Sequence, residues 1–271
     1  MDHDELLARY DRQMRRQAPA DGPGARVERV GDVVRHIAAP GDGEGDGWNG
    51  IIWSDLDDST ADAAIAEQLR YFDSLECGFE WKVYGHDRPG DLANRLLAAG
   101  FEADDEETLL VADTHALAAD TGAPAGLVLR EVNDAAGVDL AVRVQEQVFG
   151  RDASGLRGHL LAQLATPRPT TVAVLAMAGG EPVASSRVDL PVGRDFAGLY
   201  GGGTLAEWRG RGVYRAMVHF RARIAAARGH RFLQVDALPT SRPTLQRLGF
   251  TALSTTTPYV HRLGASAQHS G

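Results

Sequence analysis

The sequence contains very little cysteine and lysine, and no long apolar run. Cys77 is the one cysteine among 271 residues, so no disulfide can form within the chain and a reducing compartment fits. Lys82 is the one lysine among 28 basic residues, which we interpret as a composition bias that carries no chemistry. No apolar run approaches the roughly 20 residues of a membrane-spanning helix. The acidic first residues lead into no apolar segment, so we expect no secretory signal, a cytoplasmic location and no membrane partner.

Charge is distributed unevenly along the chain. The net charge of −9 combines a balance of −16 over residues 1–120 with one of +7 over residues 121–271. Halves of opposite charge predict two domains with different partners, and a positive half suits a nucleic acid or a phosphorylated cofactor. Residues 116–126 contain Gly and Pro without apolar periodicity and predict the boundary. We therefore predict domains over 1–120 and 127–263, a flexible loop over 40–47 and a disordered tail over 264–271.

Apolar periodicity predicts the order β-α-α-β-β-β-α-β-α-β in the second half. The strands and helices with clear bounds are expected at 127–132, 134–149, 171–177, 183–190, 196–204, 212–228 and 231–236, followed by a short helix ending at Leu248 and a last strand to about 262. The first half ends in the same way, with a strand at 79–84, a helix at 91–99 ending in Gly100-Phe101, and a strand at 108–111. A unit used once in each half predicts two copies of one fold.

The strongest motif is the turn from Thr204 to Arg215, between a strand and an amphipathic helix. Unpartnered N–H groups and the helix dipole favour an anion at such a helix start. Gly210 and Gly212 would let a diphosphate approach the backbone, and three arginines add charge for its oxygens: Arg209, Arg211 and Arg215. The alternative is an ordinary turn with solvated arginines. The third glycine of the dinucleotide fingerprint and the Gly-Lys-Ser/Thr of a Walker loop are both absent.

Arg209-Gly-Arg-Gly212-Val-Tyr214 resembles the Arg/Gln-x-x-Gly-x-Gly/Ala motif of the GNAT acyltransferase superfamily. Leu248-Gly249-Phe250 resembles the segment that closes that family's last helix. The resemblance covers residues 127–262, and the first half is similar to a shortened copy, as in tandem-domain members. It implies an α/β fold of the α+β type, with a mixed sheet in each of two GNAT-like domains.

The resemblance also implies acetyl-CoA as the acyl donor. The turn would hold its pyrophosphate, and the strand before the turn would bind the pantetheine and acetyl carbonyl through its backbone. The implied residues are Gly202, Gly203, Thr204, Arg209, Gly210, Arg211, Gly212, Val213, Tyr214 and Arg215. The sequence departs from the family twice. Tyr214 stands where the family has Gly or Ala, and Leu245 stands where a thiolate-protonating tyrosine is often found.

The equivalent turn of the first half, after Gly50–Trp53, has different chemistry. It contains no glycine and has aspartates at Asp55, Asp57 and Asp58. Their charge disfavours a diphosphate, whereas they suit the start of the following helix. We predict that this half does not bind CoA, and that it either walls the acceptor site or attracts a cationic acceptor. The aspartates lack the Gly and Glu of an EF-hand loop, so we predict no metal.

Direct acyl transfer needs a carboxylate to take the proton of the amine and a donor for the oxyanion, here a backbone N–H near Thr204. Glu207, in the turn, and Asp236, at the end of an apolar strand, are the candidate carboxylates. Tyr259 is the candidate hydroxyl donor, with Tyr200 behind it. Each has a structural alternative, namely a helix N-cap region for Glu207, a loop hydrogen bond for Asp236 and core packing for Tyr259.

Three functions remain open at this point. The first is an N-acetyltransferase acting on a primary amine of a small molecule or peptide, and the second is a non-catalytic acyl-CoA-binding sensor, which the missing tyrosine keeps open. The third is a nucleic-acid binder, which the lack of an aromatic-interleaved basic stripe disfavours. The fold does not identify the acceptor. Either a monomer or a homodimer is compatible, because tandem copies could pack like a dimer within one chain.

Overall fold

A computed structural model describes residues 2–22, 24–39, 48–119 and 122–263, through which one mixed sheet of twelve strands runs. The predicted loop at 40–47 and tail at 264–271 lie outside these residues. The first half comprises α1 (His3–Tyr10), the π-helical turn η1 (Asp11–Arg16), β1 (Arg26–Val30), β2 (Val33–Ile37), β3 (Gly50–Ser54), α2 (Ala61–Ser74), β4 (Phe79–Tyr84), α3 (Leu92–Ala98), β5 (Glu102–Ala103) and β6 (Glu107–Asp113).

The second half begins after α4, a short helix at Thr114–Ala118. Its elements are β7 (Leu127–Glu131), α5 (Ala135–Phe149), α6 (Ser154–Leu164), β8 (Thr171–Ala178), β9 (Glu181–Asp189), β10 (Phe196–Thr204), the 3-10 turn η2 (Ala206–Trp208), α7 (Val213–Ala227), β11 (Phe232–Ala237), α8 (Arg242–Arg247) and β12 (Thr251–His261). The predicted order of elements and the α/β mixed-sheet class are confirmed, with bounds that differ by one or two residues. Gly179 and Gly180 both have positive φ, as the predicted hairpin turn requires.

Helix α4 lies at the start of the stretch that the sequence predicts to be the domain boundary. The Asp113 carboxylate caps it by accepting hydrogen bonds from the N–H groups of His115 and Ala116. Leu117 is buried in the hydrophobic core that α7 shares with the sheet. A stretch of small residues that looks like a linker therefore begins with one anchored helical turn, and the position of the domain boundary stays a prediction.

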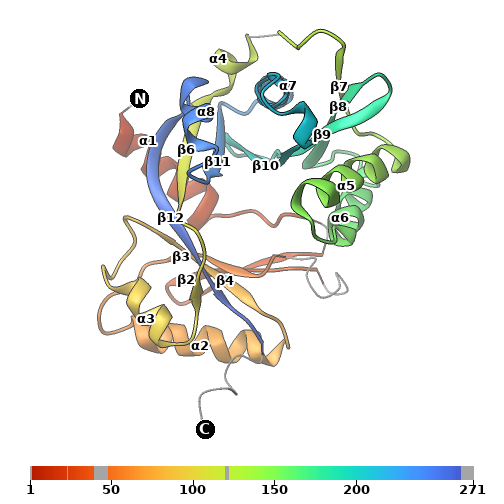
Figure 1. Ribbon diagram of the computed structural model, residues 1–271. Helices are drawn as coiled ribbons and strands as arrows, with labels where there is room; N and C mark the ends of the chain where they lie inside the picture. Colours follow the sequence, from red (N-terminus) through yellow and green to blue (C-terminus); the bar gives the residue numbers. More distant parts are fainter. Residues whose placement is uncertain (1, 23, 40–47, 120–121, 264–271) are drawn as a thin grey trace.

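The two halves interleave at the centre of the sheet, where the strand order is β4-β12-β6-β11. Strand β6 of the first half pairs antiparallel with β11 of the second, while β12 of the second half pairs antiparallel with β4 of the first. Figure 1 shows β12 as a long curved strand that extends from the second half into the first. The halves therefore exchange their last strands, and strand pairing crosses the predicted boundary.

Helices cover both faces of the sheet in the second half (Figure 1). Helix α7 contributes a row of buried residues to the core on one face, and α5 and α6 contribute another on the opposite face. Helices α2 and α3 enclose the core of the first half around Trp81. Tyr10 of α1 packs between the halves against Tyr84 and Phe196. None of the helices in the described ranges has the length and apolar character of a membrane span.

Arg15 in η1 joins the N-terminal helical segment to the strands of the first half. Its guanidinium is 1% exposed and donates to both carboxylate oxygens of Asp87, at 2.8 and 2.6 Å. It lies 3.8 Å from the ring centroid of Tyr84, and its Nε donates to the Ile52 carbonyl at 3.1 Å. The parallel pairing of β3 with β4 stops at Ile51, so Arg15 bridges the two strands where they separate.

We expect Arg15→Ala to destabilise the protein by about 3–5 kcal/mol, because it leaves the buried Asp87 carboxylate without its cation. The measurement is the free energy of unfolding from a urea titration. Arg16→Ala is the matched control, because the Arg16 side chain is 44% exposed and pairs with Asp55 only at 3.7 Å. Its cost should be about 0–1 kcal/mol. Equal losses in the two variants would contradict this account of Arg15.

Candidate active site

Strand β10 separates from its parallel neighbour β11 just before the turn that the sequence singled out. The two strands pair only over Phe196–Gly198 and Phe232–Gln234. On its other side β10 has a bulge between Tyr200 and Gly203 in its pairing with β9. Beyond Gly198 the β11 side of β10 therefore has no strand partner.

The N-terminus of α7 follows directly. Gly210 and Gly212 have φ of +74° and +79°, a backbone region that side-chain-bearing residues rarely adopt. The first helical hydrogen bond is donated by the Ala216 N–H to the Gly212 carbonyl. The N–H groups of residues 213–215 precede that bond and have no partner within the helix. The turn thus presents backbone donors at the positive end of the helix dipole.

The arginines around this turn are exposed at its surface. Arg209 donates from Nε to the Thr204 carbonyl at 3.1 Å, which ties the turn to the end of β10. The Arg211 guanidinium lies 4.8 Å from the centroid of the Trp208 ring. Arg215, in the first turn of α7, is exposed as well. Their positive charge therefore surrounds the same helix end that offers the backbone donors.

Tyr214, which replaces the family's small residue, points toward β10. A Cβ atom placed on Gly202 would lie 3.2 Å from the Tyr214 ring, and one on Gly203 would lie 3.1 Å from Val148 on the opposite face. Burial raises the pKa of Tyr214. The two glycines thus let side chains from α7 and α5 approach the strand closely from both faces.

The bulge of β10 is fixed by a side chain of α5. Gln145 donates from Nε2 to the Gly201 carbonyl at 2.7 Å and to the Ser185 carbonyl at 3.3 Å. Gly201 has φ of +58°, which the bulge requires. The carbonyl of Gly201 is therefore already engaged, and the strand keeps its shape before any ligand is present.

Tyr200 and Gln234 lie where the two strands part, on the sheet face opposite α7. Their strand positions alternate with Leu199 and Leu233, which pack in the core beneath α7. Gln234 donates from Nε2 to the Tyr200 hydroxyl at 3.0 Å. Burial raises the pKa of Tyr200 to about 12, so the phenol stays protonated at neutral pH.

Asp236, two residues beyond Gln234, shares this face and meets residues of the first half. Lys82 of β4 donates from Nζ to Asp236 Oδ2 at 2.7 Å and lies 3.6 Å from Glu107 of β6. Burial alone would lower the pKa of Lys82, but Asp236, Glu80 and Glu107 outweigh it, and that pKa is raised. Burial raises the pKa of Glu107, against the opposing effect of Lys82.

The three residues predicted for catalysis lie in different places. Asp236 is at the divergence of β10 from β11, while Glu207 is exposed on η2 beside the glycine turn that precedes α7. Tyr259 is buried in the core of the first half, on β12 opposite Trp81. Strands β6 and β11 separate β12 from β10. The structure therefore places only Asp236 beside Tyr200, and the catalytic roles themselves stay predictions.

Sequence reasoning expected the first half to wall the acceptor site or to attract a cationic acceptor, but it did not identify the residues of that half that reach this face. Lys82, Glu107 and Tyr84 reach it only through the exchanged strands, and no local pattern signals that pairing. The one available signal was that Lys82 is the only lysine of the chain, which we had assigned to composition.

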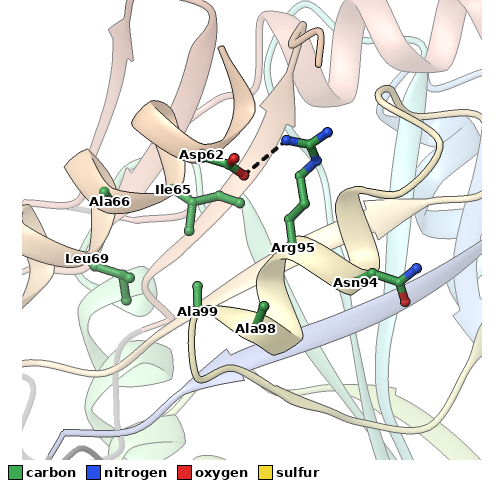
Figure 2. A pocket seen from close by; sticks show the side chains of 8 residues that line it. All are labelled: Asp62, Ile65, Ala66, Leu69, Asn94, Arg95, Ala98 and Ala99. Atoms are coloured by element: carbon green, nitrogen blue, oxygen red, sulfur yellow. Dashed lines mark hydrogen bonds and ion pairs between the residues drawn. The ribbon is translucent and has the colours of Figure 1, made fainter. Parts of the chain in front are cut away.

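A hollow of about 480 Å³ lies elsewhere, between α2 and α3 of the first half. Figure 2 shows Ile65, Leu69 and Ala99 on its walls and the Asp62–Arg95 ion pair, of 3.1 Å, at its edge. In Figure 1 these helices lie at the opposite end of the molecule from α7. The hollow therefore belongs to neither the turn nor the Asp236 face.

Comparison with known proteins supports the fold through structure alone. No family model matches the sequence, and no curated protein matches it. A GCN5-related N-acetyltransferase from Kribbella flavida superposes with a TM-score of 0.68 at 17% identity, covering 95% of this chain and 93% of that one. A functionally unknown conserved protein from Staphylococcus epidermidis also reaches 0.68, at 11% identity, covering 91% and 96%. A tandem GNAT protein from the clavulanic acid biosynthesis pathway reaches 0.59 at 15% identity, covering 90% and 85%.

The chain has the GNAT acetyltransferase fold. The fold that the resemblance implied is thereby confirmed. At these identities the comparisons carry no information on the substrate.

A pair of Gly→Ala substitutions tests the packing at the strand divergence. A Cβ on Gly198 would lie 2.5 Å from the Tyr200 ring and 2.8 Å from Gln234 Nε2, so Gly198→Ala should cost about 1–3 kcal/mol of stability by overpacking. Gly158, exposed within α6, has no atom within 4 Å of the added Cβ. Gly158→Ala should instead stabilise by about 0.5–1 kcal/mol. Urea titration measures both, and a neutral Gly198→Ala would show that Tyr200 is not held in this position.

Proposed function

We propose that the protein is an N-acetyltransferase that transfers the acetyl group of acetyl-CoA to a primary amine by direct attack. The observation that carries the proposal is the divergence of β10 from β11 immediately before the glycine-lined N-terminus of α7. An unpaired strand edge suits the amide-rich pantetheine arm, and the helix end suits a diphosphate. The GNAT fold supports the same activity.

In this proposal the pyrophosphate accepts hydrogen bonds from the N–H groups of Val213, Tyr214 and Arg215. The arginines of the turn contribute charge, and the backbone of residues 202–204 binds the pantetheine and the thioester carbonyl. The fit depends on Gly210 and Gly212, whose positive φ sets the course of the turn, and Gly202 and Gly203 leave room for Tyr214 and Val148 to pack against the strand that would bind the pantetheine.

The amine nitrogen attacks the thioester carbonyl carbon, a C–N bond forms and the C–S bond breaks. The nitrogen gives up one proton, which the Asp236 carboxylate takes, and the thiolate gains one proton on leaving. Tyr200 is the favoured hydroxyl donor to the reacting group, because its oxygen already accepts from Gln234 and its own hydrogen is left for a ligand. The thiolate needs little help, since free thiols have a pKa near about 8.5.

The setting of the reaction is also part of the proposal. We place the protein in the cytoplasm as a monomer or homodimer, with a small molecule or peptide as acceptor. It would need no metal and would bind neither nucleic acid nor a membrane.

Acetyl-CoA should raise the melting temperature of the protein. At a concentration a hundredfold above Kd the stabilisation is about 2.7 kcal/mol, which corresponds to roughly 5–10 °C. Gly212→Glu should abolish the shift, because it adds a carboxylate at the pyrophosphate site and strains a turn with φ of +79°. Thermal denaturation with and without acetyl-CoA measures both.

Gly229→Glu is the matched control, at the other end of α7. Gly229 has φ of +86° and open space around its Cβ position, so the substitution imposes similar strain and charge away from the turn. It should keep the acetyl-CoA shift. An unchanged melting temperature of the wild-type protein in saturating acetyl-CoA would reject CoA binding.

Asp236→Asn should reduce thiol release from acetyl-CoA by about 10²–10⁴-fold, the usual effect of losing a general base, and should keep the acetyl-CoA thermal shift. The assay screens amine libraries for free thiol with the wild-type protein and then compares the variant on the best acceptor. Binding without thiol release from any amine would favour the acyl-CoA sensor instead.

A further inference from the structure

We propose that Lys82, a residue of the first half, is a positioning residue that holds Asp236 ionised and oriented for the acceptor amine. The active site would then be composite, with one half binding acetyl-CoA and the other setting the state of the base. This inference rests on the proposed function, because Asp236 can act as a general base only if the protein transfers an acyl group.

The ion pair is the first observation. Lys82 Nζ lies 2.7 Å from Asp236 Oδ2, although the two residues are 154 positions apart in the chain. The Lys82 side chain is 17% exposed and that of Asp236 is 11% exposed, so bulk water screens the pair little. Strands β12 and β6 lie between β4 and β11 in the sheet, and the two side chains meet across them.

The second observation concerns Oδ1, the other carboxylate oxygen of Asp236. Asp236 Oδ1 is buried and has no hydrogen-bond partner among the described residues. Gln234 Oε1 and Thr256 Oγ1 are buried and unpartnered in the same part of the chain. A buried polar atom without a partner is costly, so acceptors of this kind point to a ligand that donates hydrogen bonds. An ammonium or amine nitrogen is such a ligand.

The third observation is the charge around the pair. The groups that interact electrostatically with Lys82 or Asp236 come from four elements, namely Glu80 and Tyr84 of β4, Glu107 of β6, Tyr200 of β10 and Tyr10 of α1. A phenol with an ordinary pKa of about 10 is already neutral at physiological pH, and burial raises the pKa of each of these tyrosines further. Lys82 is therefore a cation that faces three neighbouring carboxylates, Asp236, Glu80 and Glu107.

The consequence concerns protonation of the base. Lys82 contacts both Asp236 and Glu107. Without it, two partly buried carboxylates would face each other with no cation between them, and their mutual repulsion favours protonation of one of them. Asp236 Oδ1 would then no longer accept the proton of the amine. Lys82 would thus set the lower end of the pH range in which the enzyme works.

The decisive experiment is the pH dependence of kcat/KM for the amine, measured by thiol release in the wild type and in three variants. Lys82→Met should move the acidic limb upward by about 1–3 pH units, the usual effect of losing one adjacent opposite charge. Lys82→Arg keeps the positive charge, so it should move the acidic limb by less than about half of the shift in Lys82→Met. Protonation of the amine itself is common to all variants, and the KM for acetyl-CoA should not change.

Arg9→Met is the matched control. It breaks a different ion pair that joins the N-terminal segment to the second half, Arg9–Asp195 at 3.2 Å, and it lies outside the catalytic face. A purely structural effect of loosening the two halves would appear in this variant as well, as lower stability without a shifted pH profile.

A spectroscopic readout is available because Lys82 is the only lysine. Protein labelled with ¹³C and ¹⁵N lysine gives a single side-chain signal, with no assignment needed. In the wild type this signal should titrate above the ordinary lysine range, and Asp236→Asn should move its pKa downward. The Lys82 titration requires neither catalytic activity nor the Lys82→Met variant, so it tests the proposal even if Lys82→Met fails to fold.

Two results would overturn the proposal. One is an acidic limb of Lys82→Met that coincides with that of the wild type. The other is a Lys82 signal that titrates identically in the wild type and in Asp236→Asn. Failure of the proposed function looks different, since the wild type would then release no thiol with any amine, which removes the catalytic claim for both residues.

Discussion

The exchange of the last strands is the constraint on which the rest of the structure depends. Because β12 and β6 pair across the centre of the sheet, neither half completes its part of the sheet with its own final strand. The exchange fixes the register between β4 and β11 through two intervening strands. It thereby brings Lys82 to Asp236 and the first half to the edge of the diverging strands. A looser connection between two domains would leave that geometry to a linker.

Each half contains a parallel strand pair that separates, and the two gaps have opposite chemistry. Between β3 and β4 the chain supplies its own occupant, since Arg15 donates to the Ile52 carbonyl and stacks on Tyr84. The turn after β3 is likewise closed on itself, because Asp57 Oδ1 accepts from the N–H groups of Ser59 and Thr60. Next to the gap between β10 and β11, the N–H groups of residues 213–215 have no partner within helix α7.

Local features were predictable from the sequence, and long-range pairing was not. The glycine turn could be singled out because Gly210 and Gly212 act through their own backbone conformation, next to a helix that periodicity reveals, and its role in phosphate binding stays a prediction. The apolar pattern also gave the bounds of β10 and α7. Tyr259 could not be placed, because its strand pairs with β4 rather than with a strand of its own half. Lys82 and Asp236 meet for the same reason, since contacts between distant strands follow from the whole sheet and not from either segment.

The Lys82–Asp236 pair is also a poor way to hold two halves together. Desolvation of both charges offsets much of their attraction, and a well-packed apolar pair of similar volume often stabilises a protein as well or better. Leu109 and Leu253 show that the same region accepts apolar side chains, because both are buried against Tyr84 and Phe232. Stable packing between the two halves therefore does not require Lys82, the carboxylates of Asp236 and Glu107, or a buried oxygen without a partner. In the proposed mechanism Asp236 takes the proton of the amine, and β4 is the strand that places a cation, Lys82, beside it.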